Sequence, residues 1–181
     1  LPPASQDIMQ SLRAQYGLMG KKITLTVARL VERKGIDSCI EAVGRLYGQL
    51  PNMHYIIVGD GPDRSRLQSL IKRTPAPATL VGAASLAELS AWYSISDVFI
   101  LTPKNNQTDV EGYGTVYREA AQFAKPIVAS PVGGVPEAAG PDALYAETAP
   151  EISAALLRLL TDTKLAESIG QKCREHASTI T

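Results

Sequence analysis

The sequence lacks the features that mark fibrous, membrane-spanning or nucleic-acid-binding chains. It has only two cysteines, Cys39 and Cys173, each within an apolar helical pattern, so we expect buried free thiols rather than a disulfide. Its 18 basic residues balance 18 acidic ones without a basic block, which argues against a nucleic-acid surface. No apolar run approaches the roughly 18 residues that a membrane span needs, and the start LPPASQDIMQ lacks the parts of a signal peptide. These absences predict a soluble protein of a reducing compartment.

What is present fits one domain of ordinary size. The chain has 181 residues, of which 45% are hydrophobic and 20% are charged, close to the averages for globular proteins. A chain of this length can bury a sizeable core. A second full domain would not fit.

Apolar patterning predicts an alternation of strands and helices. Strands are expected at 21–30, 53–61, 78–82, 96–103 and 125–130, and helices at 35–50, 62–73, 85–95, about 115–123, 150–160 and 163–177. Ser85 and Glu88 have the spacing of a capping box. Such alternation predicts a Rossmann-like three-layer α/β domain with a parallel sheet over residues 21–181, and ligands bind beyond the carboxyl ends of its strands. Residues 1–20 are expected to be an interdomain linker with a helix, arriving from something upstream.

Two loops that follow strands could bind an anion. In ARLVERKG, Arg29 and Lys34 precede a helix whose first residues include Gly35, so a diphosphate would fit there. The alternative is that both side chains are solvated loop charges. VGDGPDR resembles a dinucleotide fingerprint, but Arg64 occupies the third glycine position. That segment is better explained as a strand-to-helix turn with Pro62 at the first helical position.

The stretch DVEGYGTVYREA, residues 109–120, places a carboxylate on each side of a glycine-rich turn. Gly112 and Gly114 allow a ligand to approach the backbone closely, and a helix expected from Thr115 presents N–H groups at its start. Carboxylates repel phosphates but accept hydrogen bonds from hydroxyl groups. Glu111 and Glu119 therefore suit the two ends of a nucleotide-sugar, with its phosphates between them. The alternative is that both are ordinary surface charges.

EGYGTVYREA resembles the E-x7-E motif of retaining GT-B glycosyltransferases of the "group 1" family, usually written E-G-F-G-x-x-x-x-E-A. VARLVERKG, VGDGP, SDVFILTP, KPIVAS and VGGVPE are similar to other segments of that family, in the same order. The resemblance covers nearly all of residues 22–176. It implies that the chain is the C-terminal, donor-binding domain of such an enzyme.

The resemblance also implies a role for each matching residue. Arg29 and Lys34 would hold the diphosphate, Glu119 the ribose hydroxyls, and Glu111 the transferred sugar near the reacting carbon. Backbone amides around the sugar and phosphates would come from Gly112, Tyr113, Gly114 and Thr115, and Val81 would lie near the base.

Family membership would also fix the chemistry. The family transfers a sugar with retention and without a catalytic metal, so no metal site and no cofactor are expected, the nucleotide-diphosphate-sugar being a substrate. Arg29 and Lys34 would stabilise the departing diphosphate, and Glu111 would position the sugar. The product would be a hexose joined to a glycan or a lipid-linked acceptor bound mainly by an N-terminal domain. The expected location is the cytoplasm, at the inner membrane face for a lipid-linked acceptor.

The chain departs from the usual family pattern at four positions. Phe123 and Ala124 stand where a small residue and a glycine are usual, Arg118 where an apolar residue is common, and Tyr113 where Phe is commoner. None of these changes removes a proposed ligand group. The changes at 118, 123 and 124 bear on local helix packing.

Three other functions remain open from sequence. The first is a stand-alone nucleotide-sugar-binding module, which the length of the native open reading frame would distinguish from one domain of a longer enzyme. A sugar-nucleotide epimerase would show activity with donor and no acceptor. A nicotinamide-dependent oxidoreductase, already weakened by the absent fingerprint, would bind NADH but no nucleotide-sugar.

Without an N-terminal domain, half of the reaction cleft would be open to water and no acceptor would be positioned. We therefore expect the purified 181-residue chain to bind donor weakly and to transfer essentially no sugar. A radiolabelled-donor assay with candidate acceptors measures this, and acceptor-dependent transfer by the chain alone would contradict it.

Overall fold

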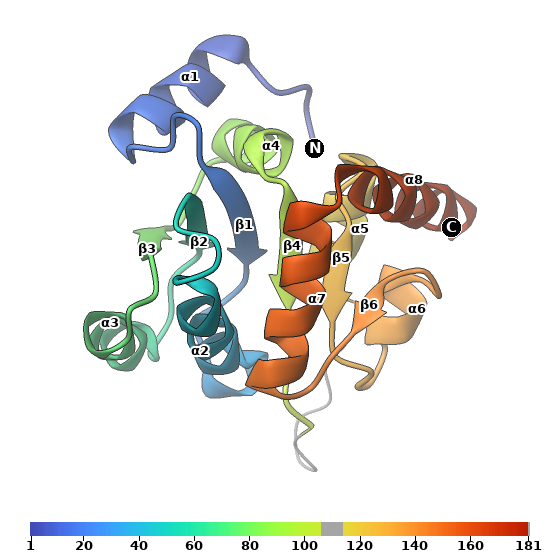
Figure 1. The fold of residues 1–181 in the computed structure, drawn as a ribbon. Helices are drawn as coiled ribbons and strands as arrows, with labels where there is room; N and C mark the ends of the chain where they lie inside the picture. The colour runs from blue at the N-terminus through green and yellow to red at the C-terminus, as the bar shows by residue number, and fades with distance from the viewer. Residues whose placement is uncertain (106–113, 181) are drawn as a thin grey trace.

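The computed structural model describes residues 1–105 and 114–180, and shows a parallel sheet with helices on both faces (Figure 1). The sheet has the order β3-β2-β1-β4-β5-β6, and every neighbouring pair is parallel. Its strands are β1 Lys22–Val27, β2 Met53–Val58, β3 Ala78–Gly82, β4 Val98–Leu101, β5 Ile127–Ala129 and β6 Leu144–Tyr145. This arrangement confirms the Rossmann-like fold predicted from the sequence.

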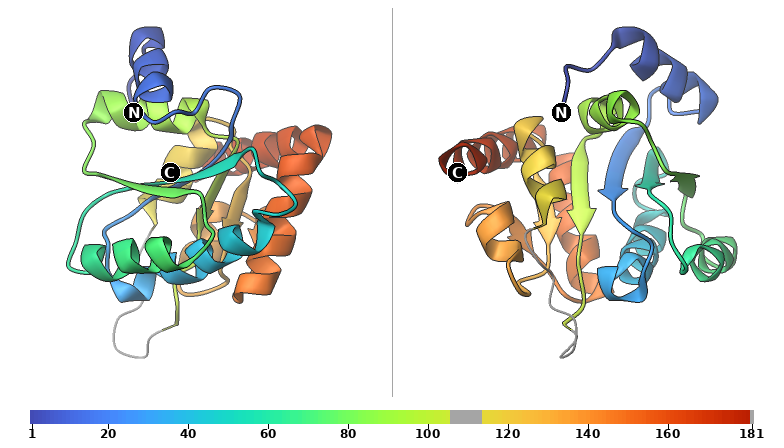
Figure 2. Two further views of the ribbon diagram at one scale, coloured as in Figure 1. Left: turned by 60° about the vertical axis from the view of Figure 1, so that its left-hand side comes forward. Right: turned by 180° about the vertical axis from the view of Figure 1, so that it is seen from behind.

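The helices lie in two layers around the sheet. They are α1 Gln6–Gln15, α2 Ile36–Leu46, α3 Arg64–Arg73, α4 Leu86–Ile95, α5 Thr115–Gln122, α6 Val135–Ala139, α7 Ala149–Thr161 and α8 Thr163–Thr179, with a 3₁₀ turn η1 at Glu32–Lys34. Helices α2 and α7 pack together in front of the sheet in Figure 1, whereas α5 lies on the face seen from behind in Figure 2. Both faces of the central strands are therefore covered.

The central strands carry side chains suited to burial on both faces. All four residues of β4 are buried, as are all but the first of β1. The two threonines of β1 break the apolar run. Thr26 joins the Tyr55 hydroxyl at 2.7 Å and donates to the carbonyl of Ile100, so its polarity is satisfied inside the core.

Most predicted elements are present: the majority have shorter bounds than predicted, α7 and α8 are slightly longer, and β3 has the predicted bounds. The capping box of Ser85 and Glu88 is formed, and Cys39 and Cys173 are free and buried, as expected. Two short elements were not anticipated: the segment expected to be a loop, 131–140, contains α6, and β6 follows it. The predicted place of Pro62 was wrong, because α3 begins at Arg64 after the N-cap residue Asp63, so Pro62 lies before the helix.

The first twenty residues pack onto the domain. Leu12 and Leu18 are buried, and the ring of Tyr16 lies 5.4 Å from that of Trp92 in α4. A guanidinium nitrogen of Arg13 donates to the carbonyl of Ile95 at the end of the same helix. Helix α1 thus rests on α4, as Figure 1 shows. Within residues 1–105 and 114–180, no helix combines the length and apolarity needed to cross a bilayer.

The turn after α5 contains the replacements at 123 and 124. The ring of Phe123 stacks on Tyr93 with centroids 5.6 Å apart. Ala124 has φ of +50°, the one positive value at a non-glycine position among the described residues. Its carbonyl lies so close to Gly170 of α8 that a Cβ on that glycine would clash with it. The turn is therefore held in place by packing on both sides.

Replacing Ala124 with glycine should stabilise the protein. Left-handed backbone strains any residue with a Cβ, so we expect Ala124→Gly to raise the free energy of unfolding by about 1 kcal/mol. Urea denaturation measures the change. Ala154→Gly, at an exposed position within α7, is the matched control and should lower stability by a similar amount. Destabilisation by Ala124→Gly would contradict the assignment of strain.

Candidate functional site

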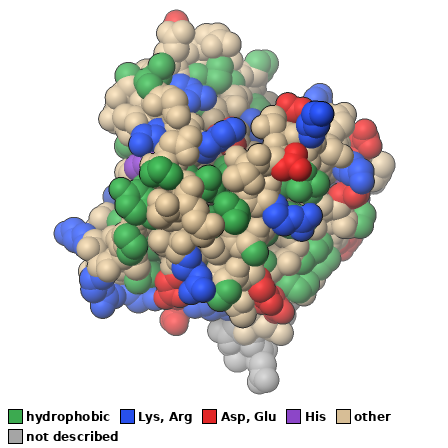
Figure 3. All heavy atoms as spheres, in the orientation of Figure 1, with side chains coloured by type: hydrophobic (Ala, Val, Ile, Leu, Met, Phe, Trp, Pro, Cys, Tyr) green, Lys and Arg blue, Asp and Glu red, His purple; other side chains and the backbone are tan. Residues whose placement is uncertain are grey.

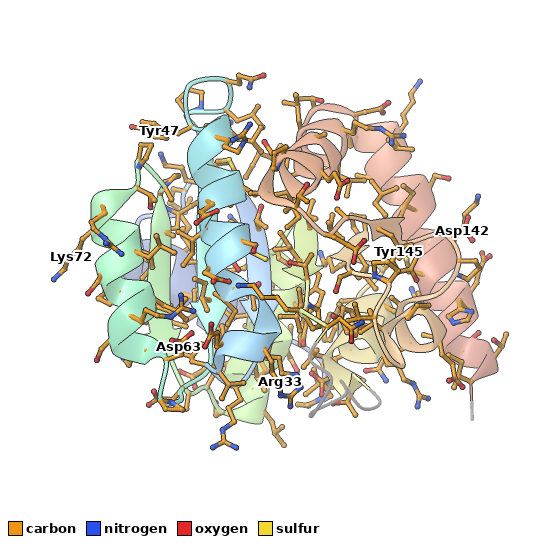
Figure 4. The ribbon with its side chains drawn as sticks, turned by 90° about the horizontal axis from the view of Figure 1, so that it is seen from below. Arg33, Tyr47, Asp63, Lys72, Asp142 and Tyr145 are labelled. Carbon is orange, nitrogen blue, oxygen red and sulfur yellow. The ribbon has the colours of Figure 1, made fainter. Side chains whose placement is uncertain are left out.

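The carboxyl ends of the parallel strands meet at one edge of the sheet, the lower edge in Figure 1. Figure 4 looks onto this edge and shows Arg33 and Asp63 on it, from the segments that follow β1 and β2. The sequence-predicted residues that the structure describes, apart from Glu119, lie on or beside the segments that leave these strands.

The segments that follow β1 and β2 are joined backbone to backbone. The N–H of Ala28 donates to Val58 at 3.0 Å, and that of Leu30 donates to Asp60 at 2.9 Å. A Cβ on Gly59 or Gly61 would clash with the carbonyls of Ala28 and Leu30 respectively. The glycines of VGDGP therefore allow one loop to lie against another, which agrees with the structural explanation of this motif.

The segments that follow β1 and β4 also touch directly. Gly35 adopts φ of +68°, and a Cβ on it would clash with the carbonyl of Thr102. Two residues further along, the N–H of Lys104 donates to the carbonyl of Arg33 at 2.8 Å. The turn that carries Lys34 is therefore seated against the end of β4.

A network of four charges braces the same three segments. The carboxylate of Asp37, in the first turn of α2, accepts from Lys104 at 2.7 Å and from Arg66 of α3 at 3.3 Å. Arg66 also donates two hydrogen bonds of 2.7 Å to the carboxylate of Asp63. The two carboxylate side chains are only 15% and 12% exposed, whereas their cationic partners are nearly half exposed.

The charge state of Asp37 follows from these contacts. Burial opposes ionisation, but the Lys104 hydrogen bond and charge, the Ser38 N–H and the Arg66 charge outweigh it. The pKa of Asp37 is therefore lowered below its ordinary value. The carboxylate stays ionised and keeps α2, α3 and the segment after β4 together.

The two predicted diphosphate ligands lie in the segment between β1 and α2. Arg29 is exposed in the loop after β1, and its side chain makes no hydrogen bond or ion pair to any residue that the structure describes. Lys34 is half-buried at the end of η1. One arginine at this edge is thus available to a ligand, and a lysine lies near the end of β4.

Helix α5 begins at this edge without an anionic group of its own. Gly114 is its buried N-cap residue, Thr115 its exposed first residue, and its first turn contains no acidic side chain. By contrast, α4, α7 and α8 are capped by the side chains of Ser85, Thr148 and Asp162. The positive end of the α5 dipole is therefore not neutralised by its own first turn.

Glu119 lies one turn into α5, partly buried. Its carboxylate accepts a 2.9 Å hydrogen bond from the hydroxyl of Tyr93 in α4. Burial and the Glu119 charge raise the pKa of Tyr93, so this hydroxyl remains a donor. The Tyr93 ring is itself fixed between Phe99 and Phe123. One oxygen of Glu119 is therefore oriented by a rigid aromatic partner.

The remaining predicted residues are divided between a neighbouring strand and the segment outside the structure. Val81 is half-buried in β3, which is separated from β1 by β2 in the sheet. The next residue, Gly82, accepts a hydrogen bond from the N–H of Gly59 in the segment after β2. Glu111, Gly112 and Tyr113 fall within 106–113, outside the described residues.

Sequence analysis missed the residues that support the site. Tyr93 pairs with Glu119 across 26 positions, and no local pattern signals that contact. Asp63 and Arg66 stand at i and i+3, a spacing that predicts their ion pair, but the addition of Asp37 and Lys104 depends on the fold. Among the described residues, no group of three or more His, Cys, Asp or Glu is placed to hold a metal ion.

Comparison with known proteins places this geometry in context. The family model described as "Glycosyl transferases group 1" matches residues 9–176. A GDP-mannose-dependent alpha-(1-6)-phosphatidylinositol monomannoside mannosyltransferase of Mycolicibacterium smegmatis is 34% identical over 135 residues, covering 72% of this chain and 35% of that enzyme. The chain thus spans about a third of that relative's length.

Two solved structures share the fold. Anabaena Alr3699/HepE, in complex with UDP and glucose, superposes with a TM-score of 0.83 at 22% identity over 98% of this chain and 49% of its own. The C-terminal domain of the group 1 family protein LpcC of Francisella tularensis superposes with a TM-score of 0.76 at 20% identity, covering 98% of this chain and 94% of that domain. The architecture of the chain is therefore that of GT-B glycosyltransferase structures.

The Asp37 network should make stability depend on pH in acid. Because the folded pKa of Asp37 is below its ordinary value of 3.8, its contribution is complete above about pH 4 and is lost as pH falls below that value. We expect Asp37→Asn to lower the free energy of unfolding at pH 7 by about 1 kcal/mol. The deficit should shrink as pH falls below 4. Urea denaturation from pH 7 to pH 3 measures this, and a deficit independent of pH would contradict it.

Proposed function

The chain belongs to the group 1 glycosyl transferases, and we propose that it binds the nucleotide-diphosphate-sugar donor of such an enzyme at the carboxyl edge of its sheet. The observation that carries the proposal is that α5, whose first turn has no acidic residue, begins at the same carboxyl edge as Arg29, whose side chain has no partner among the described residues. That combination favours a ligand with a diphosphate group, whose two phosphates carry one negative charge each.

The diphosphate is assigned to Arg29, Lys34 and the first N–H groups of α5. Arginine and lysine provide charge-assisted hydrogen bonds, and the helix start adds backbone donors with a favourable dipole. Because Gly35 has no Cβ, the turn that carries Lys34 can lie against the Thr102 carbonyl at the end of β4. As charge develops on the departing diphosphate, the same groups stabilise it without a metal ion.

The ribose is assigned to Glu119. Tyr93 occupies one carboxylate oxygen and fixes its direction, which leaves the other oxygen to accept from ribose hydroxyls. Gly114 and Thr115 offer backbone N–H groups to the phosphates and sugar. Glu111, with Gly112 and Tyr113, is assigned to the transferred sugar, and Val81 to the surroundings of the base.

The proposed reaction is transfer of a hexose with retention at the anomeric carbon. The acceptor, a glycan or a lipid-linked glycan, is assigned to an N-terminal domain outside this chain. Residues 1–20 are proposed to connect that N-terminal domain to the domain described here. The enzyme is proposed to act in the cytoplasm, at the inner face of the membrane. The relative from M. smegmatis acts on a phosphatidylinositol mannoside, which supports a lipid-linked acceptor. No observation of the structure favours the stand-alone module or the epimerase.

Nucleotide titration tests the proposal. The M. smegmatis relative is named for GDP-mannose and the Anabaena structure holds UDP, so calorimetry should compare GDP, UDP and ADP with their sugar conjugates. We expect one nucleotide to bind selectively, and Arg29→Ala to weaken it roughly tenfold or more by removing a charged hydrogen bond. Arg45→Ala, exposed at the opposite end of α2, is the matched control and should bind as the wild type does. Equal loss in both variants would overturn the assignment.

A second variant pair tests the ribose assignment. We expect Glu119→Ala to weaken the nucleotide roughly tenfold, and Tyr93→Phe to weaken it severalfold by leaving the carboxylate without its orienting donor. Inorganic pyrophosphate, which has no ribose, should bind both variants as it binds the wild type. Equal losses for pyrophosphate and nucleotide would place Glu119 at the phosphates instead.

A further inference from the structure

A charged hollow lies between α5 and α8, at least one helical turn beyond the start of α5. It has a volume of about 300 Å³ and is lined by Arg118 and Gln122 of α5 and by Arg174, Ala177 and Ser178 of α8. These residues stand at i, i+4 and at i, i+3, i+4, so each set shares one helix face. The hollow is therefore a consequence of how the two helices pack.

Two guanidinium groups share this hollow, and none of the described residues that line it carries a carboxylate. Arg118 is half-buried and donates to the carbonyl of Ile180 at 2.8 Å. Arg174 is exposed, and its side chain has no hydrogen-bond or ion-pair partner in 1–105 or 114–180. The acidic neighbour of Arg118 in sequence, Glu119, is bonded to Tyr93 on the other side of α5. Like charges thus share one concavity without a compensating anion from the residues that line it.

An apolar wall adjoins these charges. A second hollow, of about 500 Å³, shares Gln122 and Arg174 with the first and adds Phe123, Leu1, Pro2 and Pro3. The pair of hollows therefore offers cationic donors at one end and apolar surface at the other. That arrangement suits an anion that carries an apolar substituent better than it suits a bare ion.

We propose that the α5–α8 hollow binds a phosphate group, held by Arg118 and Arg174, with the Gln122 amide as a neutral donor. Guanidinium groups pair with phosphate through several parallel N–H donors, which makes arginine well suited to this anion. Two sources share this chemistry: a free phosphate, or the headgroup of a phospholipid whose apolar part lies along Phe123 and the N-terminal prolines. The residues that line the hollow include none of those assigned to the nucleotide-sugar, so this site is separate from the proposed donor site.

Calorimetry with two probes tests the proposal on the 181-residue chain. Inorganic phosphate and dihexanoyl phosphatidic acid, kept below its micelle concentration, are titrated separately, with dihexanoyl phosphatidylcholine as the probe without net charge. We expect saturable binding of at least one of the two anionic probes. Binding of phosphatidic acid tighter than phosphate identifies a lipid headgroup as the source, and equal affinity identifies free phosphate. Equal affinity for phosphatidylcholine and phosphatidic acid would overturn the role of the arginines.

Three variants locate the binding. Arg174→Gln removes a side chain without protein partners, so it should fold normally and weaken the anionic probe roughly tenfold. Arg158→Gln, an exposed arginine of α7 outside both hollows, is the matched control and should bind as the wild type does. Arg29→Ala should also retain the binding, which separates this site from the donor site. Unchanged affinity in Arg174→Gln, or loss in Arg29→Ala instead, would overturn the proposal.

Discussion

The carboxyl edge depends on direct contact between backbones where no Cβ can fit. Gly35 lies against the Thr102 carbonyl, and Gly59 and Gly61 lie against those of Ala28 and Leu30. These contacts bring the segments after β1, β2 and β4 within reach of one another, and the Asp37 network then joins them through charge. Arg29 and Lys34 lie in the first of these segments, the one that follows β1. Without the close approach, the segment that carries both cations would move independently of the segments after β2 and β4.

Helix α5 presents different chemistry on its two sides. Glu119 is held by Tyr93 within an aromatic group that also includes Phe99 and Phe123. Arg118, its neighbour in sequence, lies toward α8 and the carbonyl of Ile180. Adjacent helix positions point about 100° apart, so an acid and a base next to each other in sequence can serve different surfaces.

On the face shown in Figure 3, charges of both signs are interspersed with apolar side chains, and Lys and Arg gather over α3. The basic residues of α3 are Arg64, Arg66, Lys72 and Arg73.

Sequence patterning was sufficient for the architecture but not for the contacts within the site. The apolar runs of β1, β2 and β4 and the amphipathic helices between them predicted the parallel sheet, because their periods are local properties of the chain. β6, with two residues, is too short to carry a period, and it exists because β5 offers a partner. The same limit hid the Tyr93–Glu119 pair, which only the packing of α4 beside α5 creates. The sequence showed that Arg118 departs from the usual family pattern. Only the folded structure shows that Arg118 and Arg174 line the same hollow.

The hydrogen bonds between the loops at the carboxyl edge also affect how fast their amide hydrogens exchange with water. Amides in surface loops ordinarily exchange with water through small local fluctuations, far faster than those of a sheet. The N–H groups of Leu30 and Gly59 are instead bonded to Asp60 and Gly82, in line with the ladder of the central strands. Their exchange requires neighbouring loops to separate together. We therefore expect the amide of Leu30, beside Arg29 in a surface loop, to exchange about as slowly as those of the sheet.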